Sequence, residues 1–193
     1  MDPVAAPAAI PAPEWAGGWY YKGSRTNNDD AAVTVHGLGR NQPLPLFLEV
    51  ENHSPTGFEW GYGGSGPSQL SLALVGFSML AASQLKLWGE GFRDPLPPKQ
   101  WTPDFWSRAT NSLRREEIRA LKQQPALNTL TFGLRNSVAA CKTPVWYLPM
   151  DDVVRWIEAA MPACTAGQKL PPPPALLLEL PPMLPLKTVA IDF

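Results

Sequence analysis

Three glycines, Gly61, Gly63 and Gly66, stand in the spacing G-x-G-x-x-G directly before a segment with the pattern of a helix. In dinucleotide-binding proteins this spacing lets the backbone approach a pyrophosphate at the helix N-terminus. Here the preceding segment is short and aromatic, and the strands before it are predicted to form hairpins rather than parallel βαβ units. We therefore interpret residues 61–66 as a tight turn between sheet and helix. Binding of a phosphate or a partner's acidic side chain at this helix N-terminus is the alternative.

Two groups of residues are candidates for ligand or partner binding. The first surrounds the glycine-rich turn, and the second lies in the segment 108–135, which has six basic and two acidic side chains. A solvated helix face is the simpler interpretation of such a charge run. Nucleic-acid binding is the alternative, although the Arg-Arg-Glu-Glu order disfavours it. The candidate residues are Trp60, Tyr62, Gly63, Gly64, Ser65, Gly66, Arg114, Arg115 and Arg119.

Residues for catalysis or metal binding form no recognisable set. The only histidines, His36 and His53, have no Cys, Asp or Glu at a spacing typical of metal ligands. A nucleophile–base pair of Ser65 with His53 has no support in the pattern, because G-G-S-G lacks the context of a nucleophile elbow. We therefore expect a protein that is not an enzyme, with no cofactor and no metal.

Composition indicates one compact domain with proline-rich ends. The chain has 193 residues, 23 prolines and a net charge of −1. We predict a disordered leader at 1–14, a single domain at 15–165 and an extended tail at 166–193. No apolar run is long enough for a membrane span, and the leader lacks the pattern of a signal peptide. Two cysteines, Cys141 and Cys164, are expected to be free thiols, which favours the cytoplasm.

The elements that would position the candidate residues form an α+β fold, with a small antiparallel sheet of about four strands packed against several helices. Strands are predicted at 18–24, 31–37, 44–52 and 58–62, the first two as a hairpin. A helix should begin near Gly66, with Pro67 in its first turn and Gln69 completing a capping box. Further helices are predicted from Thr102 and from Pro149. Alternating apolar residues in 126–143 suit a strand, although that segment is ambiguous.

The segment FEWGYGGSGPSQLSLAL, residues 58–74, resembles an uncharacterised family of small proteins found in phages, plasmids and bacterial genomes. Its members carry the signature F-x-W-G-Y-x-G-S-G-P-x-x-L-A-x-x-L. Ser71 stands where alanine is usual, and residues 95–142 look like an insertion. The resemblance implies mobile-element ancestry and no assigned chemistry. Outside the centre, the matching residues are Tyr21, Gly23, Trp146, Leu148, Val154 and Trp156.

These observations favour a non-enzymatic module that binds a host or phage protein. Inhibition of a bacterial defence complex is a concrete version of this hypothesis. Eight tryptophans are many for this length, and those beside loops or helix ends would make an adhesive surface if exposed. A protein that binds a small ligand or nucleotide at the glycine-rich turn is the first alternative. Nucleic-acid binding through 108–135 is the second.

Overall fold

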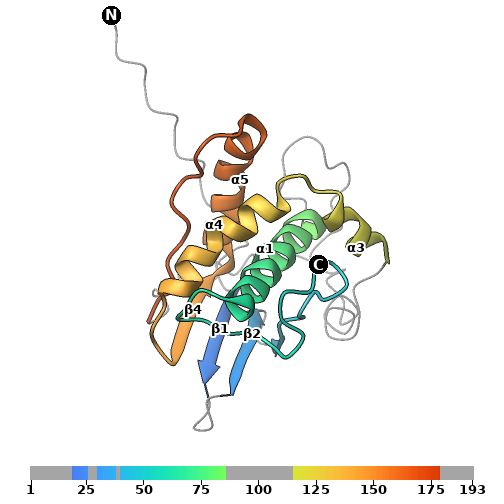
Figure 1. The fold of residues 1–193 in the computed structure, drawn as a ribbon. Helices are drawn as coiled ribbons and strands as arrows, with labels where there is room; N and C mark the ends of the chain where they lie inside the picture. Colours follow the sequence, from blue (N-terminus) through green and yellow to red (C-terminus); the bar gives the residue numbers. More distant parts are fainter. Residues whose placement is uncertain (1–18, 26–29, 38–39, 86–114, 179–193) are drawn as a thin grey trace, which may run out of the picture.

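The computed structural model describes residues 19–25, 30–37, 40–85 and 115–178 (Figure 1). Within them the chain forms the predicted α+β fold, a four-stranded antiparallel sheet covered by helices on one face. The strands are β1 (Tyr20–Arg25), β2 (Ala31–Gly37), β3 (Arg40–Pro43) and β4 (Val145–Pro149). The helices are α1 (Ser65–Leu85), α3 (Arg115–Lys122), α4 (Leu127–Ala140) and α5 (Met150–Ala166).

The sheet has the order β3-β2-β1-β4. The predicted hairpin is confirmed, because β1 pairs antiparallel with β2 from Tyr20 opposite His36 to Arg25 opposite Ala31. Two predicted strands are wrong. The third strand is Arg40–Pro43 rather than 44–52, because the chain leaves the sheet after a proline and turns at Phe47, whose φ is 59°.

The predicted strand at 58–62 is also wrong, and the fourth strand comes from a later segment. Residues 58–60 have no regular structure, and Gly61 has a φ of 90°, which no strand residue adopts. The fourth strand is instead Val145–Pro149, which pairs antiparallel with β1 and leads directly into α5. The helix predicted from Pro149 is confirmed, because Pro149 is both the last residue of this strand and the N-cap of α5.

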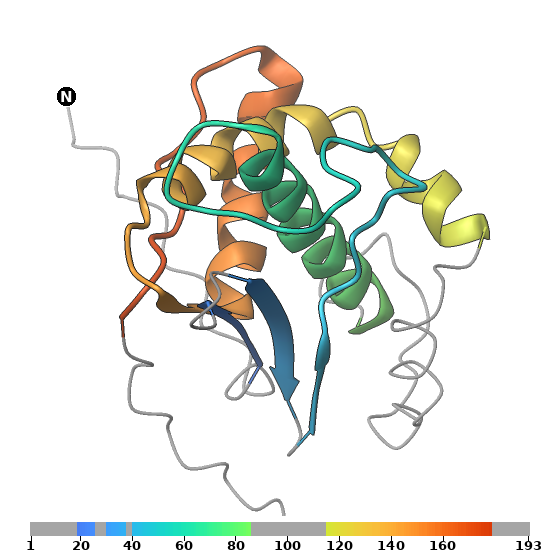
Figure 2. The same cartoon turned by 60° about the horizontal axis from the view of Figure 1, so that its bottom comes forward.

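Helix α1 is the centre of the core. Every residue from 69 to 79 is buried, so the helix has no solvent face along this stretch. A helix that is buried on all sides must be covered by other elements on all sides. The sheet covers one side, where the hydroxyl of Tyr21 lies 2.6 Å from the hydroxyl of Ser78. Helix α4 packs along another side and α5 along a third, as Figures 1 and 2 show.

Helix α4 corrects the interpretation of residues 126–143 as a possible strand. Leu130, Leu134 and Val138 are completely buried at a spacing of four, which is the helical repeat. Phe132 lies between them in sequence and is 65% exposed. The alternation of Leu130, Phe132 and Leu134 therefore has a helical explanation, in which the two leucines face α1 and the phenylalanine faces solvent.

The described part of the tail runs beside β4. Helix α5 ends at Gly167, which has a left-handed φ of 63°. Leu177 then exchanges two backbone hydrogen bonds with Tyr147, at 2.7 and 2.8 Å, so the tail covers part of the outer edge of β4. The predicted leader, the tail beyond residue 178 and most of the predicted helix from Thr102 lie outside the described residues.

Candidate functional site

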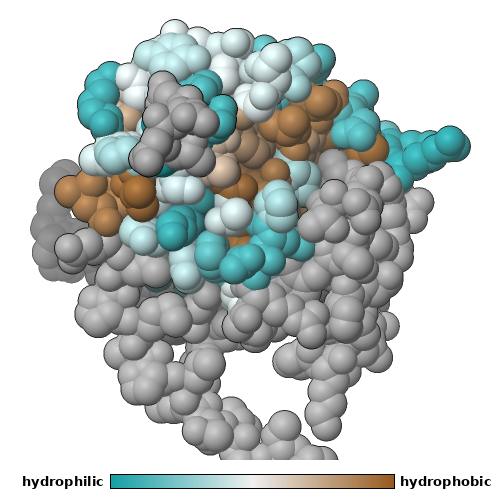
Figure 3. Space-filling model, turned by 90° about the horizontal axis from the view of Figure 1, so that it is seen from below, coloured by the Kyte–Doolittle hydropathy of each residue, from teal (hydrophilic) through white to brown (hydrophobic). Residues whose placement is uncertain are grey.

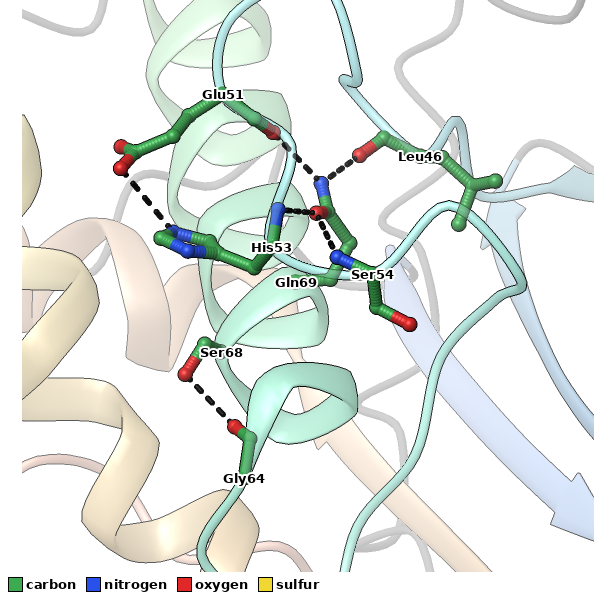
Figure 4. A network of polar contacts seen from close by, with 7 residues as sticks. All are labelled: Leu46, Glu51, His53, Ser54, Gly64, Ser68 and Gln69. Carbon is green, nitrogen blue, oxygen red and sulfur yellow. Dashed lines mark hydrogen bonds and ion pairs between the residues drawn. The ribbon is translucent and has the colours of Figure 1, made fainter.

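The connection that leads from β3 toward the glycine-rich turn is held against α1 by one buried side chain. Gln69 is completely buried in α1, and its amide bonds the connection between β3 and the turn (Figure 4). Its Oε1 accepts from the backbone N–H groups of His53 and Ser54, at 2.7 and 3.0 Å. Its Nε2 donates to the carbonyls of Leu46 and Glu51. The predicted capping box is therefore wrong, because Gln69 binds this connection and not its own helix end.

Two glycines of the turn are required by close packing. A Cβ atom at Gly66 would overlap the side chain of Glu59, and Gly66 is itself buried. At Gly61 a Cβ atom would lie 2.9 Å from the carbonyl oxygen of Cys141, at a φ of 90° that favours glycine. The Gly61 N–H donates to the carbonyl of Val138 at 3.1 Å. The turn is thus fixed against both α1 and the end of α4.

The N-terminus of α1 offers few donors to a phosphate. Pro67 has no N–H group, and the Ser68 N–H bonds the Gly64 carbonyl at 3.2 Å. The Ser68 hydroxyl donates to the same carbonyl at 2.8 Å. The sheet is antiparallel and no strand leads into the turn, so the geometry that places a dinucleotide on a Rossmann helix is missing here.

The turn and the outer side of α4 together present aromatic and basic groups to solvent. Tyr62 is 49% exposed, and Phe132 is 65% exposed. Gly63 links the turn to α4, because a guanidinium nitrogen of Arg135 lies 3.6 Å from where the Cβ atom of Gly63 would be. Arg135 and Asn136 follow Phe132 by three and four residues, one helical turn further along the same side. We call Tyr62, Gly63, Phe132, Arg135 and Asn136 the turn–α4 surface.

Trp60 lies apart from this surface. It is 2% exposed, and its indole N–H donates to the carbonyl of Thr143 at 2.8 Å. Its ring meets Trp146 edge to face at 5.7 Å, and the Arg25 guanidinium lies over it at 4.3 Å. The structure thus places this candidate residue in the core, with Phe58 beside it in the core cluster. Gly64 is half-buried and Ser65 is exposed, both at the edge of the turn–α4 surface.

The structure separates most of the basic candidates from the turn. Arg115 and Arg119 are exposed on α3, which stands on the other side of α1 from the turn in both ribbon views (Figures 1 and 2). Arg114 lies outside the described residues. Arg135 is the member of the basic segment 108–135 that reaches the turn. Phe132 and Arg135 were missed as candidates because their segment was expected to be a strand.

The outer face of the sheet has an aromatic group that sequence reasoning also missed. Tyr20 and His36 stack across the β1–β2 ladder, with ring centroids 4.6 Å apart and an interplanar angle of 6°. Tyr147 lies 6.1 Å from Tyr20, and the Lys22 ammonium lies 5.9 Å from the Tyr147 ring. The sequence could have indicated this aromatic group, because alternate residues of a half-buried strand lie on the same face of the sheet.

Hydrophobic residues also reach the surface elsewhere. Seen from below, the described residues show brown, hydrophobic areas with hydrophilic residues between them (Figure 3). Among the described helices, none is both long enough and apolar enough to cross a membrane. Within the same residues, His, Cys, Asp and Glu side chains form no group of three or more that could hold a metal ion.

Comparison with known protein families gives a match to part of the chain. A model described as a family of unknown function (DUF6166) matches residues 21–88. This segment contains β1 except for its first residue, β2, β3, the glycine-rich turn and α1, and it ends before α3, α4, β4 and α5. No curated protein and no solved structure matches the chain.

Proposed function

We propose that this protein is a non-enzymatic protein-binding module that contacts its partner through the turn–α4 surface. The observation that carries the proposal is the exposure of Phe132 on the outer side of a helix whose other side is core. Arg135 lies one helical turn further along α4 and beside Gly63, which follows the exposed Tyr62, and aromatic residues and arginine are the types enriched at protein interfaces. A rigid base supports these side chains, because the turn is fixed to α1 and α4 on both sides.

We also propose that the protein originates from a phage or another mobile element. The signature at 58–74 resembles proteins of phages and plasmids, and a family of unknown function matches residues 21–88. A module of a phage or mobile element would act in the cytoplasm of its bacterial host. Its partner would be a host or phage protein, and a bacterial defence complex that the module inhibits is the most concrete version.

Capture from bacterial lysate with matched surface variants tests the proposal. The purified chain should retain a stoichiometric partner, and Phe132→Ser and Tyr62→Ser should each weaken retention at least about tenfold. Leu178→Ser is the control, because Leu178 is 67% exposed and lies outside the turn–α4 surface. Urea unfolding of each variant should match the unchanged chain. The proposal fails if no stoichiometric partner is retained, or if all three variants retain it equally.

Nucleic-acid binding through the segment 108–135 is the second candidate. Arg115, Arg119 and Lys122 are exposed on α3, which supports it. Binding of this kind would weaken steeply as salt increases, because cations released from the phosphates drive it. Replacing Arg119 and Lys122 with glutamine would reduce the salt dependence by about one unit of slope each. A retained protein partner whose binding depends on Phe132 instead favours the first candidate.

A further inference from the structure

A pocket of about 280 Å³ opens beside the glycine-rich turn. Its walls come from three parts of the chain that are far apart in sequence. These are Arg25 at the end of β1, Trp60 and Gly61 before α1, and the connection 141–144 between α4 and β4. The pocket is smaller than the roughly 300–1,000 Å³ usual for drug-sized ligands. It therefore suits a ligand of a few atoms or one chemical group.

The walls carry two positive side chains, Arg25 and Lys142, and no negative one. Lys142 is exposed, and its ammonium donates to the carbonyl of Gly61. An ammonium has three N–H groups, so one bond to a carbonyl leaves it able to bind a further acceptor. Arg25 is fixed more firmly, because its Nη2 donates to Glu59 at 2.6 Å and to the carbonyl of Trp60 at 3.0 Å.

We propose that this pocket binds a small anion, with a carboxylate or phosphate group held by Lys142 beside the guanidinium of Arg25. Trp60 and Thr143 are also among the residues that line the pocket. The Glu59 carboxylate offsets the charge of Arg25, so Lys142 supplies the net positive charge, and low-dielectric walls concentrate its field in a pocket. The site is separate from the turn–α4 surface and does not depend on the function proposed for that surface.

Cys141 provides a probe inside the pocket. Its thiol lies 3.4 Å from the Thr143 hydroxyl, and both residues line the pocket. Cys164 on α5 is also free and half-buried but is not part of the lining, so it serves as an internal reference. Iodoacetate and iodoacetamide alkylate thiols alike but differ in charge. A pocket that attracts anions should therefore favour iodoacetate at Cys141 alone.

The experiment measures both alkylation rates at each cysteine by peptide mass spectrometry at low salt. The iodoacetate-to-iodoacetamide ratio at Cys141 should exceed that at Cys164 by at least about fivefold. Burial raises the pKa of the Cys164 thiol, which slows both reagents there and cancels in the ratio. Lys142→Gln should bring the ratio at Cys141 down to that at Cys164. Lys122→Gln, the matched control on exposed α3, should leave it unchanged.

Competition with simple salts completes the test. Potassium phosphate or potassium acetate should slow the reaction of iodoacetamide with Cys141 and not with Cys164, while potassium chloride of equal ionic strength should not. Protection by only one of the two anions would identify the group that the pocket accepts. Equal ratios at the two cysteines, or no protection of Cys141 by either anion, would overturn the proposal. Urea unfolding of Lys142→Gln confirms that the variant is folded.

Discussion

The indole ring of Trp146 fills the space that any side chain at Gly23 would occupy. The two residues are partners across the β1–β4 ladder, and Trp146 is completely buried. Trp146 in turn meets Trp60 edge to face. A glycine in the first strand is therefore a condition for the aromatic pair that joins the sheet to the segment before α1.

Replacing Gly23 with alanine should destabilise the protein. The added methyl group would overlap the indole of Trp146, and overpacking of a core costs about 1–3 kcal/mol. The free energy of unfolding in urea measures the loss. Gly63→Ala is the matched control, because its Cβ would meet only Arg135 at 3.6 Å, an ordinary contact. The two variants should differ clearly, and equal losses would mean that the Trp146 ring moves aside freely.

Replacing Gln69 with leucine should release the connection between β3 and α1. The change keeps the side chain's size but leaves four backbone groups without their partner. Each unsatisfied buried group costs about 1–3 kcal/mol, so a total loss of at least about 3 kcal/mol is expected. Hydrogen exchange should accelerate most at the His53 and Ser54 amides. Unchanged protection of those two amides would contradict the role assigned to Gln69.

The Tyr20–His36 stack should make stability depend on pH. Burial, and then the nearby Lys22, lower the pKa of His36 in the folded protein. The unfolded chain therefore binds a proton more readily, so the free energy of unfolding should fall as pH drops below about 6.5. Urea unfolding at pH 7.5 and pH 5.5 measures this change. The difference in the free energy of unfolding between the two pH values should be smaller in His36→Gln and, to a lesser extent, in Lys22→Gln. If the difference in His36→Gln equals that of the unchanged chain, this histidine is not its source.

Asp151 should have the opposite effect on stability. Burial raises its pKa to about 6, although it lies in the first turn of α5, where a carboxylate was expected to be favoured. Its Oδ1 is buried without a hydrogen-bond partner. The folded protein therefore holds this proton more tightly, and the contribution to stability is lost as pH rises from about 4 to 6.

Asp151→Asn should consequently stabilise the protein at pH 7 and not at pH 4. Partial exposure to solvent reduces the expected gain to roughly 1 kcal/mol. Asp152→Asn is the adjacent control, and it removes an exposed ion pair with Arg155 at 2.7 Å, which is worth less than about 1 kcal/mol. Thermal unfolding at both pH values compares the variants. A gain from Asp151→Asn that is equal at pH 4 and pH 7 would show that the charge is not responsible.

Local patterns predicted the parts of the fold that rest on local interactions. The β1–β2 hairpin follows from two apolar strands around a turn, and α5 follows from the spacing of Val153, Trp156 and Ile157, all of them buried. The α+β class follows from the same two patterns. Helix α1 was found as well, starting at Ser65, within a residue or two of the predicted cap.

The elements that the sequence patterns did not predict depend on packing between segments that are far apart in sequence. Residues 145–149 pair with β1, where Gly23 leaves room for Trp146, and this pairing joins segments that are far apart in sequence. The alternation of Leu130, Phe132 and Leu134 suggested a strand. In the structure the two leucines lie one helical turn apart and are buried against α1, while Phe132 is exposed. The turn–α4 surface could not be predicted for the same reason, since Gly63 and Arg135 come together only after α4 packs on α1.

The segment matched by the family of unknown function includes the whole of α1 but neither α4 nor β4. Helix α4 covers α1, and β4 covers the edge of β1. The burial of α1 therefore depends on elements outside the matched segment. A relative that shares only residues 21–88 must supply its own cover for a helix that is buried on every side. In such a relative the half of the turn–α4 surface that comes from α4 would be free to differ, while Tyr62 and Gly63 lie in the matched segment itself.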